Sequence, residues 1–304
     1  MTHHAHALVS TCVLVTGATG FLGAALCKLL KSSGAEVHGV SRTARTTQGV
    51  SRWWQGSLGD ISFVRRLFAE LRPSHVFHLA GAVTGVRDLD VVVPTFVGNL
   101  AATVNLLTAA AEARCGRVVM AGSLEEPDDP HEPPSSPYAA SKLGEYQYAR
   151  MFQSLYDLPV VVPRVFIAYG PGQDHPKKLI PHVVSSLLRG ESPQLSSGTR
   201  PVDWVYVDDV AEGLVSAALA GDVTQRVDIG SGTLVTVRAI VEKIAGMIAP
   251  SSPKPLFGAL PDRAMEQVRV ADVATTTRLT GWAPRTPLEV GLRQTVDWLR
   301  GRLA

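Results

Sequence analysis

The sequence predicts an α/β protein in which helices cover both faces of a parallel sheet, with a smaller lobe built from the later part of the chain. Strand-like apolar runs alternate with helical patterns through the first half, an order that is typical of parallel sheets. The first of these runs ends in a glycine-rich turn that leads directly into a helix. Beyond about residue 168, prolines and glycines become denser and the expected strands become shorter, which indicates a change of architecture.

The first half supplies most of the main sheet. Apolar residues at helical spacing follow Asp60, which is expected to cap that helix, and Gly34 suits the left-handed end of the helix before it. The expected strands cover residues 12–16, 36–40, 53–55, 75–79, 117–121 and 160–166, and the expected helices cover residues 21–33, 61–71, 96–114 and 138–156.

The second half is expected to supply one more strand and the smaller lobe. A strand over residues 227–229 returns to the sheet, and helices are expected over residues 179–189, 209–219, 237–248 and 288–303. We predict a first, dinucleotide-binding domain of residues 1–168, completed by residues 208–232, and a substrate-binding lobe of residues 169–207 and 233–304. Ligands are expected between the two, because open parallel sheets bind them beyond the carboxyl ends of their strands.

Composition places the chain among ordinary globular proteins. Its 304 residues are 45% hydrophobic and 18% charged, which argues against disorder. A net charge of +2 is too balanced to indicate nucleic acid or a membrane surface as the partner. Neither a bilayer-spanning run nor a signal peptide is expected, and three cysteines in expected core elements indicate a reducing, cytoplasmic setting. No metal site is predicted, and His3, His4 and His6 are interpreted as residues of a frayed terminus.

The glycine-rich turn after the first strand has the spacing of a phosphate-binding turn. Gly17 allows a sharp turn, Gly20 lets the backbone approach a pyrophosphate, and Gly23 allows the helix to pack closely on the strand. The helix start adds free N–H groups and a partial positive charge. The turn therefore predicts a dinucleotide site, although a tight connection without a ligand can carry the same three glycines.

A second group of residues indicates oxidation–reduction chemistry. Tyr138 and Lys142 share one face at the start of an expected helix, and Ser123 follows an expected strand at the same edge of the sheet as the glycine turn. A tyrosine is a poor acid or base at neutral pH, but a nearby ammonium lowers its pKa. Together the three side chains suit proton transfer while a nicotinamide transfers hydride. The Tyr138–Lys142 pair alone could equally be an ordinary surface pair.

The motifs together resemble those of the extended short-chain dehydrogenase/reductases of the nucleotide-sugar epimerase/dehydratase family, from about residue 13 to the end of the chain. The resemblance is carried by TGATGFLG (16–23), HLAG (78–81), Asn99, Ser123, SPYAASK (136–142), Arg164 with YGP (169–171), and Arg200 with DWVYVDDV (203–210). It implies a Rossmann-type fold, a nicotinamide cofactor and a nucleotide-diphosphate sugar as substrate.

The resemblance also implies roles for single residues. Ser123, Tyr138 and Lys142 would form the catalytic triad, and Glu125 stands where dehydratases carry a catalytic acid. The residues expected to contact the cofactor are Gly17, Thr19, Gly20, Phe21, Leu22, Gly23, Ser41, Arg42, Ser57, Leu58, Leu79, Ala80, Gly81, Asn99, Tyr138 and Lys142. Those expected to contact the substrate are Thr84, Ser123, Lys178, Arg200 and Arg263, with the two arginines on its phosphates.

One departure from the family pattern concerns the cofactor. Ser41 and Arg42 follow the second strand, where NAD enzymes of this type carry an aspartate. No carboxylate there repels a 2′-phosphate, and Arg42 is able to pair with one, so NADP(H) is expected over NAD(H). Stacking of Arg42 on the adenine of either cofactor is the alternative.

Three further departures concern other contacts. Ser57 replaces the first acid of a GDxxD segment that meets the adenine. Leu124 replaces the acid that dehydratases carry before the position of Glu125, which makes a 4,6-dehydratase less favoured. Ile167 replaces an asparagine that contacts the substrate phosphate in the family.

We therefore predict an NADPH-dependent enzyme that reduces C4 of a nucleotide-linked 4-keto-6-deoxyhexose, with Tyr138 as the proton donor. The close alternative is a C4 epimerase with tightly bound NAD, ahead of a 4,6-dehydratase. A non-catalytic dinucleotide-binding protein is the alternative from another class. The resemblance also implies a homodimer in which the helices expected over residues 96–114 and 138–156 pair.

Overall fold

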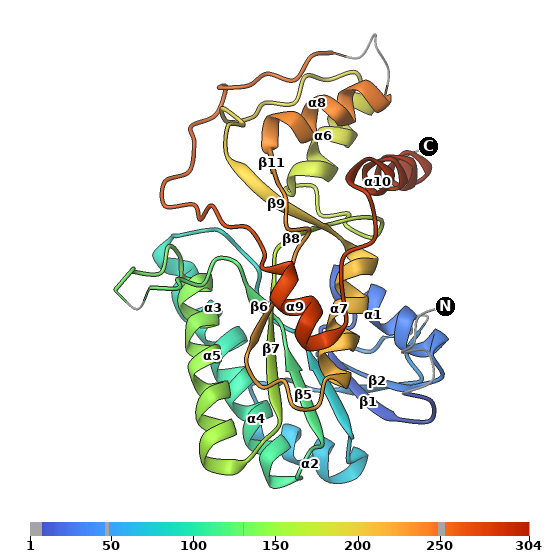
Figure 1. Cartoon of the computed structure of the whole chain (residues 1–304), viewed down its shortest axis with the longest axis vertical. Helices are drawn as coiled ribbons and strands as arrows, with labels where there is room; N and C mark the ends of the chain where they lie inside the picture. Colours follow the sequence, from blue (N-terminus) through green and yellow to red (C-terminus); the bar gives the residue numbers. More distant parts are fainter. Residues whose placement is uncertain (1–7, 46–48, 130, 249–252, 304) are drawn as a thin grey trace.

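The structure, a computed structural model, describes residues 8–45, 49–129, 131–248 and 253–303. It contains an eight-stranded sheet in the order β10-β7-β5-β4-β1-β2-β3, with β6 paired to β7. Each pair in this sheet is parallel (Figure 1), which confirms the predicted doubly wound α/β fold. The strands are β1 (Cys12–Thr16), β2 (Glu36–Ser41), β3 (Arg52–Gln55), β4 (His75–His78), β5 (Arg117–Met120), β6 (Gly122–Ser123), β7 (Val160–Val165) and β10 (Arg226–Ile229).

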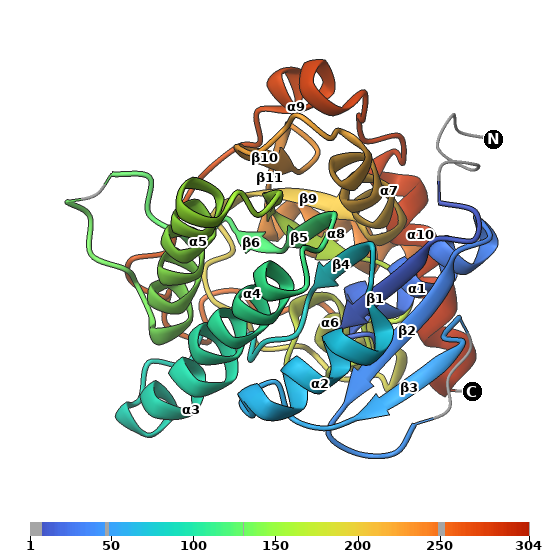
Figure 2. The same cartoon turned by 90° about the horizontal axis from the view of Figure 1, so that it is seen from below.

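Helices cover both faces of this sheet (Figure 2). One face carries α1 (Phe21–Ser32) and α7 (Val207–Leu219), and the other carries α2 (Ile61–Leu71), α4 (Ala102–Glu112) and α5 (Pro137–Tyr156). Asp60 caps α2 as predicted, because its carboxylate accepts the Ser62 N–H at 2.9 Å.

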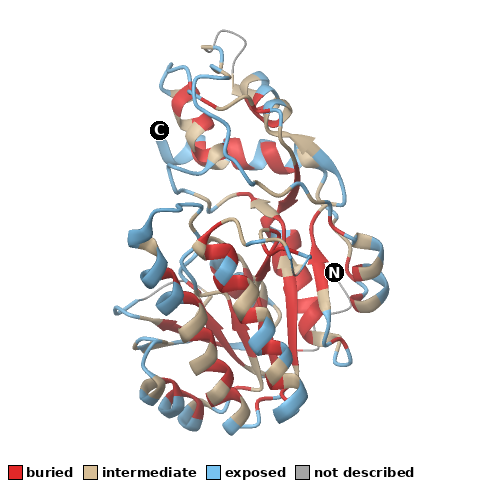
Figure 3. Cartoon of the chain, turned by 90° about the vertical axis from the view of Figure 1, so that its left-hand side faces the viewer, coloured by how far each residue is buried: buried red, intermediate tan, exposed pale blue. Residues whose placement is uncertain are grey.

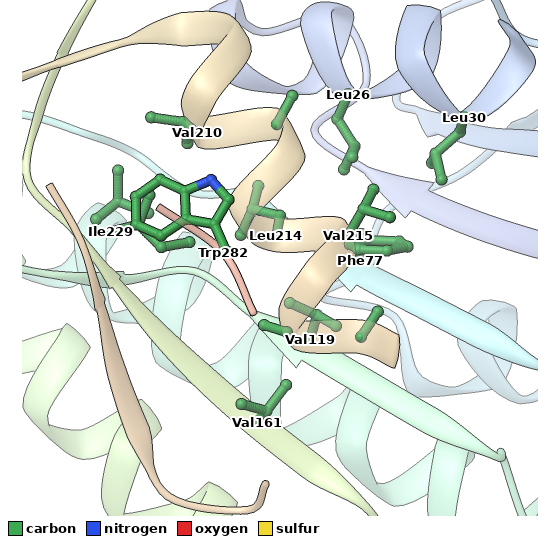
Figure 4. Close-up of a cluster of buried hydrophobic side chains, with 14 of the residues drawn as sticks. Leu26, Leu30, Phe77, Val119, Val161, Val210, Leu214, Val215, Ile229 and Trp282 are labelled. Atoms are coloured by element: carbon green, nitrogen blue, oxygen red, sulfur yellow. The ribbon is translucent and has the colours of Figure 1, made fainter. Parts of the chain in front are cut away.

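Each face has its own apolar core, and the strands between the two cores are buried (Figure 3). Beneath α1 and α7, the buried side chains include Leu26, Leu30, Phe77, Val119 and Leu214 (Figure 4). Beneath α2, α4 and α5, they include Leu67, Phe68, Leu106, Leu107 and Phe152. Strands buried on both faces explain the nearly continuous apolar runs of the sequence.

The helical stretch before β5 differs from the prediction of one helix over residues 96–114. It begins at Leu89 as η1 (Leu89–Val91) and α3 (Val92–Phe96), widens into the π-type turn η2 (Val97–Ala101), and continues as α4. The helical start before residue 96 was not predicted, because residues 89–95 do not show the spacing of apolar and polar residues that is typical of an amphipathic helix. By length and composition, Leu89–Glu112 could cross a membrane, which was not expected, but core helices of soluble proteins pass the same test.

A second sheet lies beyond the carboxyl edge of the main one (Figure 1) and was not predicted. It has the order β11-β9-β8 and consists of β8 (Ile167–Tyr169), β9 (Pro201–Tyr206) and β11 (Leu234–Thr236). The strand predicted over residues 160–166 corresponds to β7, and β8 follows it after the single residue Phe166, so the chain passes directly from the main sheet into the second one. The second sheet packs with α6 (Leu179–Leu188), α8 (Val237–Ile248) and α10 (Leu288–Leu303) around a third core.

The chain returns to the main sheet where residues 227–229 predicted it. Strand β10 pairs in parallel with β7, and α9 (Val273–Thr280), which was not predicted, packs against it. Trp282 follows α9 and is buried in the core beneath α7 (Figure 4). Residues from far along the chain therefore help to close the main sheet.

Candidate active site

The glycine-rich turn connects β1 to α1 at the carboxyl edge of the main sheet. Gly17 has a φ of +70°, and a Cβ there would lie 2.7 Å from the backbone of Leu79 and Ala80. A Cβ on Gly23 would lie 2.1 Å from the carbonyl oxygen of Gly17. Both positions therefore require glycine, because a side chain at either would separate packed backbone segments.

The start of α1 presents free backbone donors. Gly20 is the N-cap and supplies no side-chain cap, and its own N–H is bonded to the Gly17 carbonyl at 2.9 Å. The first helical bond is made by the Ala24 N–H, so the N–H groups of Phe21, Leu22 and Gly23 have no intrahelical acceptor. Uncapped donors at a helix start suit a phosphate group. Thr19 is exposed beside them.

A buried histidine ties the turn to its neighbours. His78 Nδ1 lies 2.7 Å from Thr16 Oγ1, and Nε2 lies 2.9 Å from Thr103 Oγ1. The Thr16 hydroxyl also accepts the Ala80 N–H at 3.2 Å. Burial, followed by the charge of Lys142, lowers the pKa of His78 to about 3, so the imidazole that joins β1, β4 and α4 is neutral.

Asn99 positions the segment after β4. It is fully buried in η2, where its Oδ1 accepts the Ala82 N–H at 2.6 Å and its Nδ2 donates to the Ala82 carbonyl at 3.3 Å. A Cβ on Gly81 would lie 3.2 Å from Asn99 Oδ1. Asn99, which was predicted as a cofactor contact, thus uses its side-chain amide to hydrogen-bond the backbone of Ala82, directly after Leu79, Ala80 and Gly81.

The residues predicted for the adenosine end lie after β2 and β3. The Ser41 carbonyl accepts the Gly56 N–H at 3.0 Å, which brings the two segments together. The Leu58 carbonyl accepts from Asn105 Nδ2 at 2.9 Å. Two predicted residues at this end, Arg42 and Ser57, are exposed.

Ser123, Tyr138 and Lys142 come together at the carboxyl edge of the sheet. Ser123 ends β6, and the other two occupy the first turns of α5, whose N-cap Ser136 accepts the Ala139 N–H at 3.1 Å. All three are buried. The Ser123 hydroxyl and the Lys142 charge both act on the Tyr138 phenol in the direction that lowers its pKa. The structure therefore assembles the group that the sequence predicted.

The Lys142 ammonium has two anchors. Its Nζ donates to the Ala121 carbonyl at 2.9 Å and to Glu145 Oε2 at 2.9 Å. Glu145 was not predicted as a site residue. Its position seven residues after Tyr138 places it on the same face of α5, which is the signal that could have found it.

Lys142 acts to lower the pKa of Tyr138 as predicted, but the pKa of the phenol is nevertheless above its ordinary value. Burial raises the pKa of Tyr138, and this rise outweighs the lowering by the charge of Lys142 and by the Ser123 hydroxyl. The local motif reports the ammonium but not the loss of water around the phenol. The phenol is therefore protonated at neutral pH, which is the state of a proton donor.

Glu126 lies directly behind Ser123 and was not predicted as a site residue either. It is fully buried, its Oε1 accepts the Ser123 N–H at 2.6 Å, and its Oε2 accepts from Arg226 Nη2 at 2.6 Å. Burial raises the pKa of Glu126, and the charge of Arg226 opposes that rise. The Arg226 guanidinium also lies 3.9 Å from the ring centroid of Tyr146.

Charged side chains from three segments gather around Glu125. Burial raises the pKa of its carboxyl, whereas the charges of Arg200, Lys178 and Arg263 lower it. Arg200 Nη1 pairs with Glu266 at 3.0 Å, and Nη2 donates to a backbone carbonyl at 2.9 Å. The structure thus brings predicted catalytic and substrate residues into one electrostatic group.

Residues 263–269 cross from this group to two other loops. Arg87 donates to the Ala264 carbonyl at 2.7 Å, and Arg269 donates to the Glu126 carbonyl at 2.8 Å. Arg263 extends over Gly85, with its Nη1 3.1 Å from where a Cβ would lie. Thr84, the remaining predicted substrate residue, precedes that glycine.

Two predictions concern groups other than these. Ile167 lies in β8 and packs against apolar neighbours, so it offers no side-chain hydrogen bond. Within the four described ranges, no group of three or more His, Cys, Asp or Glu side chains is placed to hold a metal ion. His3, His4 and His6 lie outside the described residues.

Comparisons with known proteins agree with this geometry. The model of the NAD dependent epimerase/dehydratase family matches residues 13–230. The low-salt glycan biosynthesis protein Agl12 of Haloferax volcanii is 30% identical, over 95% of this chain and 98% of its own length. A dTDP-glucose 4,6-dehydratase of Neisseria gonorrhoeae is 29% identical over 94% of either chain. The structure of the Thermus thermophilus UDP-glucose 4-epimerase with NAD has a TM-score of 0.81 and 28% identity, covering 95% of this chain and 99% of that one.

The parallel sheet and the uncapped glycine-rich turn define an α/β protein of the dinucleotide-binding type. The chain belongs to the NAD dependent epimerase/dehydratase family, which confirms the resemblance seen in its motifs.

Proposed function

We propose that the protein is an NAD(P)-dependent oxidoreductase of nucleotide-linked hexoses, and that it uses NADPH to reduce the C4 ketone of an NDP-4-keto-6-deoxyhexose. The observation that carries the proposal is the buried group of Ser123, Tyr138 and Lys142 beside the glycine-rich turn. Relatives named for dTDP-glucose dehydration and UDP-glucose epimerisation support a nucleotide sugar as substrate.

The turn and its surroundings fit a dinucleotide. The N–H groups of Phe21, Leu22 and Gly23 would hold the pyrophosphate at the start of α1. Backbone atoms already fill the space beside Gly17 and Gly23, so the ligand would lie on the opposite side of the turn. Lys142 keeps one of its three N–H groups for the nicotinamide ribose. When bound, the nicotinamide supplies the hydride.

Tyr138 would donate a proton to the C4 oxygen. Burial raises the pKa of the phenol, so it is protonated at neutral pH, and the Ser123 hydroxyl would hydrogen-bond the same oxygen. The Lys142 ammonium stabilises the phenolate that remains after transfer. The three residues therefore supply an acid, a hydrogen bond and a compensating charge.

The charged group around Glu125 would bind the diphosphate. Arg200, Arg263 and Lys178 all act on the Glu125 carboxylate. A diphosphate could bind the same three positive charges, either in place of that carboxylate or beside it. Leu124 is buried and offers no acid, which supports reduction over dehydration, although Glu125 is retained.

The test follows nicotinamide absorbance while the purified protein is mixed with a nucleotide-linked 4-keto-6-deoxyhexose and either NADPH or NADH. We expect stoichiometric loss of NADPH. Tyr138→Phe should lower turnover at least about a hundredfold and keep NADPH binding, whereas Tyr156→Phe, at the far end of α5, should change neither. Full activity of Tyr138→Phe would contradict the catalytic assignment.

A C4 epimerase is the second candidate, and the Thermus thermophilus UDP-glucose 4-epimerase with NAD favours it. Such an enzyme oxidises and re-reduces the same carbon, so it consumes no external cofactor. Co-purifying NAD, together with no loss of NADPH or NADH absorbance, would decide for the epimerase.

The NADP(H) preference rests on Arg42, which is exposed at the end of β2 without a neighbouring carboxylate at position 41. Arg42→Ala should raise the NADPH dissociation constant about tenfold, as expected for a lost charge-assisted contact. NADH binding should stay unchanged. Equal weakening of both cofactors would assign Arg42 to the adenine instead.

We further propose a cytoplasmic homodimer in which α3, η2, α4 and α5 pair with a second copy. Leu89, in η1 directly before α3, is 87% exposed, and Phe96 in α3 is 52% exposed. Large apolar side chains that are exposed together are typical of protein–protein interfaces. The free cysteines Cys12, Cys27 and Cys115 support a reducing compartment. The domain division that we propose, at residues 168, 207 and 232, differs from the two sheets in two places. Its first boundary falls within β8, and α9 and Trp282, which it assigns to the lobe, pack on the main sheet.

A further inference from the structure

Glu145 is a buried carboxylate that the proposed reaction leaves unused. Its side chain is 3% exposed, and its Oε2 lies 2.9 Å from Lys142 Nζ. Among the residues that the structure describes, its Oε1 has no hydrogen-bond partner. A buried carboxylate with one bare oxygen is costly, so the contact with Lys142 calls for a functional reason.

We propose that Glu145 is a positioning residue that anchors the Lys142 ammonium and, through its negative charge, sets the pH range in which Tyr138 holds its proton. The inference rests on the proposed roles of Tyr138 and Lys142. It does not depend on which sugar or which nicotinamide cofactor the protein uses.

The anchoring role follows from the geometry of the ammonium. Lysine has three N–H donors on a flexible stem. One donates to Ala121 at the end of β5 and one to Glu145 on α5, so a strand and a helix together fix the direction of the third. Without Glu145, a single carbonyl would hold the ammonium.

The charge role follows from the surroundings of the phenol. Glu145 and Lys142 share a helix face with Tyr138, where the carboxylate opposes and the ammonium favours its ionisation. His78 is neutral, and Glu126 is paired with Arg226. The titratable and charged groups that face this set are His78 from β4, Glu125 and Glu126 after β6, and Arg226 from β10 through Glu126.

Removing the charge of Glu145 has a predictable direction. Glu145 also raises the pKa of Lys142. While the ammonium stays charged, it would act on Tyr138 without an adjacent anion, so the phenol would ionise at lower pH. In the reduction, where Tyr138 must begin protonated, the alkaline loss of activity would then start at lower pH. A purely structural role for Glu145 would lower the rate at every pH and leave the profile in place.

The test titrates tyrosinate absorbance of the protein without substrate or cofactor. The difference between each variant and its Tyr138→Phe partner isolates Tyr138 from the other five tyrosines. Glu145→Gln should move the Tyr138 midpoint about one pH unit lower, and Glu145→Asp, which keeps the charge, should stay near the unmodified protein. Glu112→Gln, which removes an exposed carboxylate paired with Arg65, is the matched control and should not move it.

An unchanged midpoint in Glu145→Gln would overturn the proposal. If Glu145→Gln does not fold, Glu145→Ser provides room for water and undergoes the same titration. If neither variant folds, Glu145 is structural and the proposal is wrong. If the unmodified protein shows no reductase activity, the proposed function is wrong, but the Tyr138 titration still tests the role of Glu145.

Discussion

Glu126 and Arg226 lie 100 residues apart in the sequence and form an ion pair of 2.6 Å behind the backbone of Ser123. The other Glu126 oxygen accepts the Ser123 N–H, so the pair connects β10 to a predicted catalytic residue. A buried pair is costly to break because the remaining charge is left uncompensated.

Arg226→Met should therefore lower the free energy of unfolding by about 3 kcal/mol and reduce turnover by displacing Ser123. Urea denaturation and steady-state kinetics measure the two effects. Arg150→Met is the control, since Arg150 is an exposed arginine whose guanidinium lies 5.9 Å from the ring centroid of the same Tyr146. Equal stability of the two variants would refute the structural role of the pair.

Stability should fall in acid through His78. Its pKa is about 3 in the folded protein and 6.5 when unperturbed, so the unfolded chain binds the extra proton between these values and stability declines as the pH falls from about 6.5 to 3. The upper limit of this loss is about 5 kcal/mol. Urea midpoints measured across this range should flatten in His78→Gln. They should keep their slope in His131→Gln, where the residue is exposed.

Gly23→Ala should abolish dinucleotide binding and destabilise the fold. Its Cβ would lie 2.1 Å from the Gly17 carbonyl oxygen, which is closer than any real contact, so the turn or α1 must move. Gly246→Ala in α8 meets nothing within 4 Å and should raise stability by about 0.5–1 kcal/mol. Thermal unfolding and NADPH titration check both, and wild-type affinity in Gly23→Ala would contradict the model of the turn.

Phe96→Asp should shift the protein from dimer to monomer in sedimentation experiments, because the charge would be buried in the proposed interface. Val290→Asp places the same charge on an exposed apolar position of α10 and should leave the assembly unchanged. A dimer that survives Phe96→Asp would assign the exposed apolar surface of α3 to another use.

Short-range patterns in the sequence were sufficient for much of this protein. The strands β1 and β2, the cap of α2 by Asp60 and the return of β10 follow from periods and punctuation that act within a few residues. The glycine-rich turn and the Ser123, Tyr138 and Lys142 group were predictable because each stands in a recognisable local segment.

Other features depend on segments that meet only in the folded chain. The pairing of Glu126 with Arg226 and that of Arg200 with Glu266 join distant segments. The second sheet combines two three-residue strands, β8 and β11, which are too short to show a period, with β9, which is buried along nearly its whole length and shows no alternation. Local patterns can show that a face is apolar or charged, but they do not show what will cover it.

The sequence by itself determined the order of elements, the dinucleotide-type turn and the identity of the proposed acid, because backbone sterics and side-chain spacing are local properties. Only the tertiary structure decided that the pKa of Tyr138 is raised, that Lys142 is held by Glu145, and that the Asn99 amide hydrogen-bonds the Ala82 backbone. Each of these depends on burial, since the loss of water around a polar group is set by every element that packs against it.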